Sequence, residues 1–137
     1  MEAAWQQAYP SECVIVRPTG IYGTSVTRMI KLAETTKSYP KLHWSNRIHI
    51  DDLVAFLAHL LHVEHTEKSY ICSNSQPLPL HEIIQWFQQQ LGFPTLVLES
   101  DVSSGKQIHA TRMQQMNFEL QHPHCFDDYL VLLEKRE

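Results

Sequence analysis

One short apolar run constrains the fold of this chain more than any other feature. Residues 13–16 are Cys-Val-Ile-Val, and Pro10 and Pro18 stand on either side of them. A strand that is apolar on both faces is typical of a buried position in a parallel sheet. A second short strand is predicted at residues 69–72, after a segment with helical periodicity. Two strands joined by a helical crossover predict an α/β fold with a parallel sheet.

Amphipathic patterns and helix-breaking residues predict the other elements. Asp51 and Asp52 are expected to cap the helix that follows them, because carboxylates accept hydrogen bonds from free N–H groups. Pro79 suits the start of another helix and Gly92 suits its end. The sequence predicts helices at residues 2–8, 26–33, 51–61, 79–91, 108–116 and 126–133, a glycine turn at 19–23 and a third strand at 95–98. Three strands are too few for a complete parallel sheet, so the chain is expected to be part of a larger unit.

Composition narrows the class of protein. The chain has 137 residues, 43% of them hydrophobic and 19% charged, which fits one globular domain. Its formal charge of −4 does not favour binding to nucleic acid, which is itself negatively charged. No apolar run approaches the ~18 residues of a membrane span. Three cysteines lie far apart and the N-terminus has no signal-peptide pattern, so free thiols in a reducing cytoplasm are expected.

The glycines exclude a dinucleotide-binding fingerprint in this sequence. Gly20, Gly23, Gly92 and Gly105 are the only four, so neither GxGxxG nor GxxGxxG can be written anywhere. No GK[ST] phosphate loop occurs either. The chain is therefore expected to bind neither NAD nor NADP by itself.

Four short motifs follow one another along the chain. They are RPTGIYG at residues 17–23, NRIHIDDL at 46–53, SYICSN with PLPLHEI at 69–83, and GKQI with NFELQHP at 105–123. In this order they resemble the extended short-chain dehydrogenase/reductase family, the NAD-dependent epimerases and dehydratases. The resemblance covers nearly the whole chain. It implies the C-terminal part of a Rossmann-like, doubly wound sheet together with the small substrate-binding subdomain.

The resemblance also implies that part of the enzyme lies outside this sequence. The family's catalysis uses a YxxxK pair, in which the tyrosine is the general acid or base and the lysine lowers its pKa. None of the five tyrosines here is followed by lysine at the fourth position. Residues 2–8 match the end of the helix that begins with YxxxK. Residues 1–137 are therefore expected to be the C-terminal, substrate-side portion, without the N-terminal dinucleotide-binding half and without a catalytic residue of their own.

The resemblance assigns a cofactor-binding role to the turn after the first strand. Pro18, Thr19, Gly20 and Ile21 match the family's turn on the nicotinamide side of the cofactor. The alternative is a strand-ending turn that only needs glycine flexibility. The family usually continues YGPG, whereas this chain continues YGTS.

Arg47 is the candidate substrate-binding residue. It matches an arginine that faces the substrate phosphate or sugar in many relatives, a role that suits the fixed fork of a guanidinium. The alternative is a structural ion pair with Asp51 or Asp52. His49 is expected to be a structural histidine rather than a catalytic base. Histidines recur at positions 59, 62 and 65, and His and Cys cluster at 122–125. Neither cluster favours a metal site, because histidines three residues apart point to different sides of a helix, and a proline makes residues 122–125 a turn.

Together these features predict a fragment of an NAD(P)-dependent epimerase/dehydratase-like oxidoreductase that acts on a sugar nucleotide or a similar small polar metabolite. NAD or NADP and the substrate are expected to bind the intact parent, and the chain alone is expected to be inactive. The alternative is a non-catalytic remnant that serves as an interaction or oligomerisation module. Because the strand around residues 14–16 would lack cover, the folded form is expected to be a homo-oligomer or to be held by the missing N-terminal half.

Overall fold

The computed structural model describes residues 2–8 and 13–135 of the chain. Strands and helices alternate as the sequence predicts, with several additional short strands. In chain order the elements are α1 (Glu2–Ala8), β1 (Ile15–Pro18), β2 (Gly20–Tyr22), α2 (Thr27–Thr35), β3 (Ser38–Tyr39), β4 (Leu42–Ser45), β5 (Arg47–His49), α3 (Ile50–Leu60), β6 (Ser69–Cys72), β7 (Leu78–Pro79), α4 (Leu80–Leu91), β8 (Val97–Leu98), β9 (Ser103–Ser104), α5 (Thr111–Gln114) and α6 (Cys125–Lys135).

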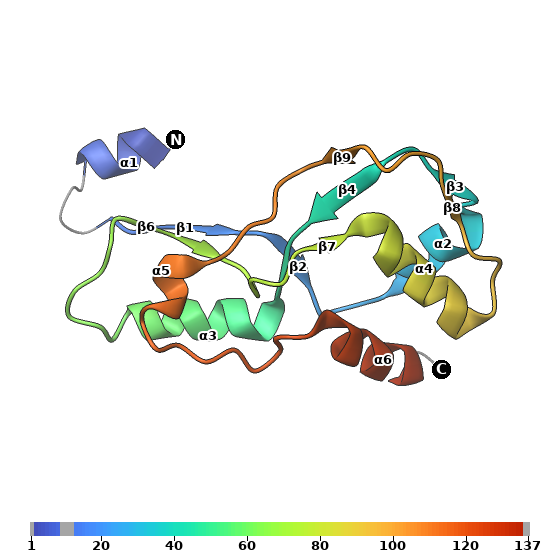
Figure 1. The fold of residues 1–137 in the computed structure, drawn as a ribbon. Coiled ribbons are helices and arrows are strands. Elements are labelled where there is room, and N and C mark those ends of the chain that lie inside the picture. The colour runs from blue at the N-terminus through green and yellow to red at the C-terminus, as the bar shows by residue number, and fades with distance from the viewer. Residues whose placement is uncertain (1, 9–12, 136–137) are drawn as a thin grey trace.

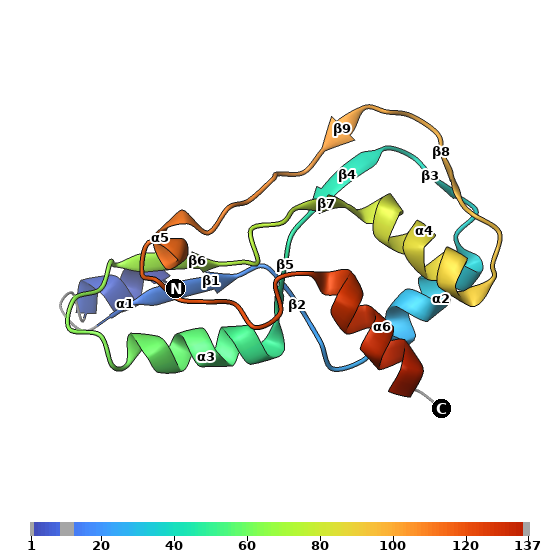
Figure 2. The same ribbon diagram turned by 60° about the horizontal axis from the view of Figure 1, so that its bottom comes forward.

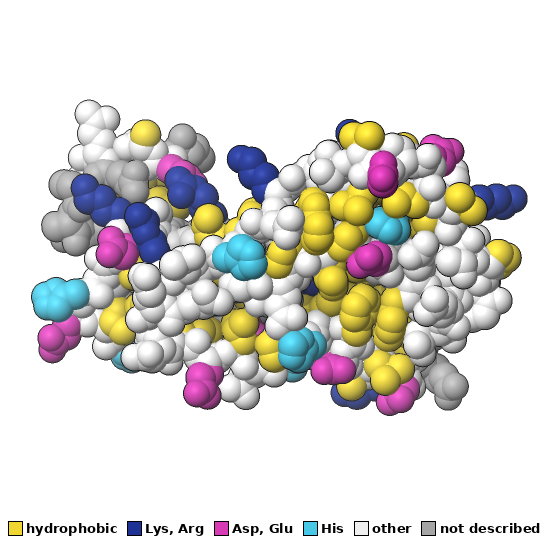
Figure 3. Space-filling view, in the orientation of Figure 1, with side chains coloured by type: hydrophobic (Ala, Val, Ile, Leu, Met, Phe, Trp, Pro, Cys, Tyr) yellow, Lys and Arg dark blue, Asp and Glu magenta, His cyan; other side chains and the backbone are white. Residues whose placement is uncertain are grey.

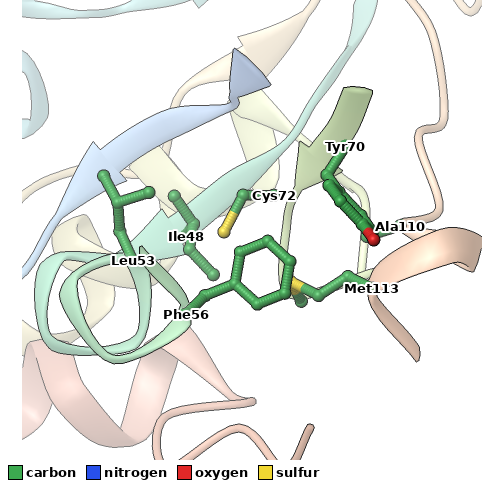
Figure 4. Close-up of a cluster of buried hydrophobic side chains, with 7 residues drawn as sticks. All are labelled: Ile48, Leu53, Phe56, Tyr70, Cys72, Ala110 and Met113. Carbon is green, nitrogen blue, oxygen red and sulfur yellow. The ribbon is translucent and has the colours of Figure 1, made fainter. Parts of the chain in front are cut away.

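The first part of the fold is a parallel pair of strands with a helix packed against it. β1 and β6 are hydrogen-bonded in parallel, with Ile15 opposite Ser69 and Pro18 opposite Cys72. The chain passes from one strand to the other through α3, which lies along the pair in both ribbon views (Figures 1 and 2). The core between them (Figure 4) consists of Ile48, Leu53, Phe56, Tyr70, Cys72, Ala110 and Met113. This parallel crossover confirms the predicted α/β class.

The second part packs three helices around a separate core. α2, α4 and α6 gather at the opposite end of the molecule from α1 (Figures 1 and 2). Their core consists of Val26, Ala33, Ile83, Phe87, Cys125 and Tyr129. Between the two parts, β2 runs parallel to β5, and β4 pairs with β7 and β9. The short strands β2 and β5 therefore lie where the two parts meet.

The first strand differs from its prediction. The structure places β1 two residues later than predicted, and it leaves Arg17 and Pro18 exposed and Ile15 and Val16 half-buried. Among the described residues only β6 pairs with β1, so one edge of β1 is open. This half-burial fits the expectation that the strand lacks cover in this chain, because among the described residues β1 has a strand on one edge alone.

Other local predictions can be compared in the same way. Residues 20–22, predicted as part of a turn, form β2 because they pair with β5. The helix predicted at 108–116 shrinks to α5, and the strand predicted at 95–98 shrinks to β8. α4 follows Pro79 and ends at Gly92, whose φ of 76° lies in the left-handed region, as predicted. The three cysteines are free thiols, also as predicted. No helix in the described part of the chain has the length and apolar character needed to cross a membrane.

Candidate functional site

The segment that runs from the end of β1 through Thr19 into β2 lies where the carboxyl ends of two parallel strands meet. Thr19 donates its backbone N–H to the carbonyl oxygen of Cys72 (N···O 3.1 Å), which holds the segment against the end of β6. Gly20 donates to the carbonyl oxygen of Asn46 at 3.0 Å, and a Cβ at Gly20 would come within 3.1 Å of that oxygen. In open α/β sheets, ligands bind outside the carboxyl ends of the strands. Residues 18–21, the predicted nicotinamide-side turn, thus occupy the edge of the sheet at which such ligands bind.

Ile21, in β2, lines a cavity. Its side chain is 51% exposed, and together with Tyr22, Arg28 and Tyr129 it lines a cavity of about 270 Å³ between β2, α2, α4 and α6. A second cavity of about 550 Å³ shares the loop before α2 and extends to Lys135. Arg28 and Lys135 form no hydrogen bond or ion pair within the described residues. Two unpaired cations beside open cavities fit an anionic ligand.

Arg47 is buried. It is only 6% exposed; Nη2 donates to the Ser45 hydroxyl at 2.6 Å, while Nη1 is buried without a hydrogen-bond partner. Neither Asp51 nor Asp52 forms an ion pair with it, so the structural ion pair considered as the alternative is absent. Burial of a guanidinium with one unsatisfied nitrogen is costly, which makes this side chain a candidate for binding an anion.

Burial governs the proton state of the two tyrosines that wall the 270 Å³ cavity. Burial raises the pKa of Tyr129 to about 12, although the nearby Arg47 guanidinium acts in the opposite direction. Burial and the hydrogen bond from its O–H to Asp128 Oδ2 (2.6 Å) raise the pKa of Tyr22 far above its usual range. Both side chains are therefore neutral near pH 7, and Tyr22 donates its hydroxyl proton to Asp128. Neither has the lowered pKa that a catalytic tyrosine base needs.

The two aspartates at the start of α3 do not cap it. His49 is the N-cap, because its Nδ1 accepts the backbone N–H of Asp51 at 3.0 Å. Asp52 is 0% exposed and accepts the N–H groups of Gln121 (2.8 Å) and His122 (2.9 Å). The prediction that both aspartates cap this helix is wrong, because the Asp52 carboxylate binds a segment 69 and 70 residues away. The structural role predicted for His49 is confirmed.

Gly23 leaves room for this histidine. Its φ is 117°, and a Cβ at this position would lie 2.5 Å from Nε2 of His49. A side chain there would be strained by its backbone conformation and would collide with the imidazole. The second glycine of the motif at residues 17–23 therefore serves the packing of His49.

The histidine clusters singled out in the sequence do not form ligand sets. Within residues 2–8 and 13–135, the one group that could hold a metal ion is His49, His122 and Asp128, whose ligand atoms lie within 4.8 Å of one another. Neither the histidines at 59, 62 and 65 nor the run at 122–125 forms such a group. Sequence patterns missed Asp128 and Arg28, because neither lies in a recognisable motif: Asp128 follows Asp127 in the first turn of α6, and Arg28 lies in the first turn of α2.

Comparison with known proteins gives matches among solved structures. No protein-family model matches the chain, and no curated protein matches it. A Methylobacillus flagellatus protein described as an NAD-dependent epimerase/dehydratase is 28% identical, with a TM-score of 0.74, and the match covers 96% of this chain and 50% of that one. The Bacillus anthracis dTDP-glucose 4,6-dehydratase in complex with NAD is 17% identical, with a TM-score of 0.71, over 98% of this chain and 48% of that one. A human epimerase family protein with NADPH is also 17% identical, with a TM-score of 0.69, over 89% of this chain and 48% of that one.

These matches agree with the motifs that carry the family resemblance. Each covers most of this chain, whereas the chain spans about half the length of each solved structure. The motif at residues 17–23 begins at the end of β1, which pairs in parallel with β6, as in a Rossmann-like sheet. The chain thus has the fold of the C-terminal portion of the extended short-chain dehydrogenases/reductases, the class of the NAD-dependent epimerases and dehydratases.

Proposed function

We propose that this chain is the C-terminal, substrate-side portion of an NAD(P)-dependent epimerase/dehydratase-like oxidoreductase. The observation that carries the proposal is the position of residues 19–21, between β1 and the start of β2, at the carboxyl ends of β1 and β6 in a fold shared with such enzymes. There their backbone would line the nicotinamide side of a cofactor held mainly by an N-terminal half. Since residues 1–137 include neither a glycine fingerprint nor a YxxxK pair, the chain alone is proposed to be inactive.

The residues at this edge of the sheet fit a nicotinamide ring. Ile21 offers a half-exposed apolar side chain, and Gly20 leaves the backbone beside it without a side chain. When bound, the nicotinamide would supply hydride transfer, and this chain would shape the pocket and limit the access of water. Because one similar structure carries NAD and another NADPH, either NAD or NADP is proposed for the intact enzyme.

Two arginines favour an anionic substrate. Among the described residues, Arg28 has no hydrogen-bond or ion-pair partner at the cavity that Ile21 also lines, and Arg47 keeps a buried Nη1 without a hydrogen-bond partner. A phosphate or sugar oxygen in that cavity would accept a charge-assisted hydrogen bond from Arg28. Arg47 lies behind the cavity wall, beside Tyr129, and is proposed to bind the substrate as well. One of the similar structures is a dTDP-glucose 4,6-dehydratase. A sugar nucleotide or a similar small polar metabolite is therefore the proposed substrate.

The open edge of β1 and exposed apolar side chains on β6 and α3 favour a partner polypeptide that covers them. Ile71 on β6 and Val54 and Leu57 on α3 are exposed, although large apolar side chains gain on the order of 1.5–3 kcal/mol each from full burial. An unpaired strand edge also recruits another chain. The proposed partner is the N-terminal half of the enzyme or a second copy of this chain.

A different apolar surface favours the alternative, a non-catalytic interaction or oligomerisation module. Apolar side chains gather over β7, α4 and α6 on the face that Figure 3 shows. On α6, Leu130 and Val131 are exposed. Contiguous exposed apolar surface marks sites of protein–protein contact, which need no catalysis.

Calorimetry with and without an N-terminal half tests the leading proposal. The chain is co-expressed with the N-terminal half of the Methylobacillus flagellatus protein, and the purified complex and the chain alone are titrated with NAD and NADP. We expect binding in roughly the micromolar range for the complex with one of the two, and none for the chain alone. Ile21→Glu is expected to weaken binding about tenfold, which is roughly 1.4 kcal/mol. Val97→Glu, a similarly exposed residue on β8, serves as the matched control and should leave binding unchanged.

Two outcomes would count against this proposal. Micromolar binding of NAD or NADP to the isolated chain would show that the cofactor does not need a second half. Failure of the two halves to associate, with self-association of the chain in sedimentation equilibrium, would favour the interaction module instead.

A further inference from the structure

One face of the β1–β6 pair points away from α3 and carries polar side chains. Tyr70 and Cys72 on β6 belong to the core beneath α3. Because side chains alternate along a strand, Ser69 and Ile71 point to the opposite face, as does Arg17, which lies opposite Ile71 on β1. α1 lies on this side of the pair and α3 on the other (Figure 1). These three side chains therefore belong to a surface that α3 does not cover.

The segment at residues 109–112 runs beside β6. Ala110 and Met113 are each 1% exposed and anchor this part of the chain in the core. The residues around them, His109, Thr111 and Arg112, are exposed. The two buried anchors thus leave an imidazole, a hydroxyl and a guanidinium at the surface next to β6.

A pocket of about 200 Å³ lies between β1 and this segment. It is lined by Arg17, Ser69, Ile71, His109, Thr111 and Arg112. Since β6 pairs with β1 and is also joined to α5, β6 forms the floor of the pocket between the other two walls. None of these six described lining residues is acidic. Lys and Arg side chains also gather on this side of the molecule, beside α1 (Figure 3).

Several hydrogen-bond donors that line the pocket have no partner among the described residues. Arg112 uses Nη1 for the carbonyl oxygen (2.9 Å) and the hydroxyl (3.2 Å) of Ser69, so its Nε and Nη2 remain available. The Ser69 hydroxyl accepts from Arg112, so it can donate its own proton to a ligand. Arg17 uses Nε and Nη2 for the Glu2 carboxylate, which leaves its Nη1. Within the described chain the Thr111 side chain forms no hydrogen bond.

The charge of these groups favours a small anion. Arg112 has no ion-pair partner within residues 2–8 and 13–135. Arg17 is paired with Glu2, but both side chains are about half exposed, so solvent screens this pair and leaves Arg17 able to attract a second anion. A phosphate group carries nearly two negative charges at pH 7 and three strong acceptor oxygens, which suits donors that approach from two walls and a floor. Guanidinium groups bind phosphate through paired N–H donors.

We propose that this pocket binds a small phosphate-bearing ligand, with Arg112 as the principal contact. The phosphate accepts hydrogen bonds from the available nitrogens of Arg112 and from the hydroxyls of Ser69 and Thr111. Arg17, on the facing wall, offers its remaining nitrogen to a second phosphate group. The site goes beyond the proposed enzymatic function and does not depend on it. Its lining residues all belong to this chain, and none of them lines the two cavities beside α2.

An NMR titration of the 137-residue chain with pyrophosphate tests this site. At low ionic strength we expect saturable binding with a Kd on the order of 1 mM or tighter. The shifts of backbone amides should concentrate at residues 69–71 and 109–112. Acetate is the comparison ligand, because it offers one charge and two oxygens, and it should bind at least about tenfold more weakly.

Two substitutions in the pocket are each matched by a control elsewhere. Arg112→Gln removes the charge and the paired donors, and it should weaken pyrophosphate binding about tenfold or more. Lys31→Gln, which removes an exposed charge on α2, should change the affinity less than about twofold. Thr111→Glu places a carboxylate at the pocket and should abolish binding by charge repulsion. Thr95→Glu, the same substitution at an exposed threonine before β8, should not.

Several results would overturn the proposal. One is the absence of saturable binding up to about 10 mM pyrophosphate. A second is a set of shifts confined to residues 21–32 and 129–135, which would place the anion in the cavities beside α2 instead. Acetate binding as tight as that of pyrophosphate, or unchanged affinity in Arg112→Gln, would also contradict it. If Arg112→Gln does not fold, Thr111→Glu decides the question, since that threonine side chain has no hydrogen bond to lose in the described chain. Retained binding in Thr111→Glu would refute the site.

Discussion

Replacement of Asp52 by alanine should be among the most destabilising single changes in this chain. Its carboxylate is 0% exposed and accepts two backbone N–H groups, from Gln121 at 2.8 Å and His122 at 2.9 Å. A hydrogen bond to a charged group contributes about 1.5–3 kcal/mol, so the loss of both should lower the free energy of unfolding by about 3–6 kcal/mol. Domains of this size are stable by only about 5–15 kcal/mol, so Asp52→Ala removes a large share of the total.

Urea denaturation followed by tryptophan fluorescence measures this effect. Asp52→Asn keeps the shape and one acceptor oxygen, and it should lose about half as much stability, roughly 1.5–3 kcal/mol. Asp51→Ala is the matched control, because its carboxylate is 71% exposed and its ion pairs are worth about 1 kcal/mol at most. If Asp52→Ala proves no less stable than Asp51→Ala, the bond between α3 and the C-terminal segment does not hold the fold together as argued.

Three further predictions concern packing and ionisation. Gly23→Ala should lower the unfolding free energy by about 2–4 kcal/mol in the same denaturation assay, because its Cβ would lie 2.5 Å from an imidazole nitrogen at a φ of 117°; Gly92→Ala, with nothing within 4 Å, should cost only about 1 kcal/mol. Burial raises the pKa of the Cys72 thiol to about 12, so a disulfide reagent near pH 8 should modify Cys13 while Cys72 reacts only on unfolding; equal rates would contradict this. The pKa of Tyr129 is raised to about 12, so its contribution to stability is complete below its unfolded value near 10 and is lost as pH rises toward 12. Between about pH 10 and pH 12, thermal melts should show that the unfolding free energy of the unmodified chain falls with pH more steeply than that of Tyr129→Phe, by about 1.4 kcal/mol per pH unit. Identical slopes would contradict the raised pKa of Tyr129.

Hydrophobic periodicity and helix-breaking residues predict the helices that are specified by their own sequence. The apolar stripe of α3 and the pair formed by Pro79 and Gly92 around α4 are visible in the sequence, and the structure confirms both helices. β2 and β5 are different, because three-residue strands have no period and form only by pairing with each other across more than twenty residues. The half-burial of the first strand agrees with the expectation that it lacks cover in this chain, because among the described residues a strand lies on only one of its edges.

The candidate site was predicted in part, and the reason lies in long-range contacts. The turn at residues 18–21 could be placed at the end of a strand from its motif, and the structure brings it to the carboxyl edge of the parallel pair. Local sequence patterns cannot predict that the Asp52 carboxylate accepts a hydrogen bond from an amide 69 residues away. They also cannot predict that His49 is the N-cap of α3. Likewise, the burial of Arg47 beside α6 follows from the packing of that distant helix.

The most direct test of the central claim is a crystal structure of the chain assembled with a family-type N-terminal half and NAD or NADP. The account predicts that β1 pairs along its open edge with a strand of that half. It also predicts that the segment at residues 19–21 contacts the nicotinamide ring at van der Waals distance, about 4 Å. An assembled complex in which this segment faces away from the ring, with other residues between them, would contradict the assignment of this chain to the substrate side of an oxidoreductase.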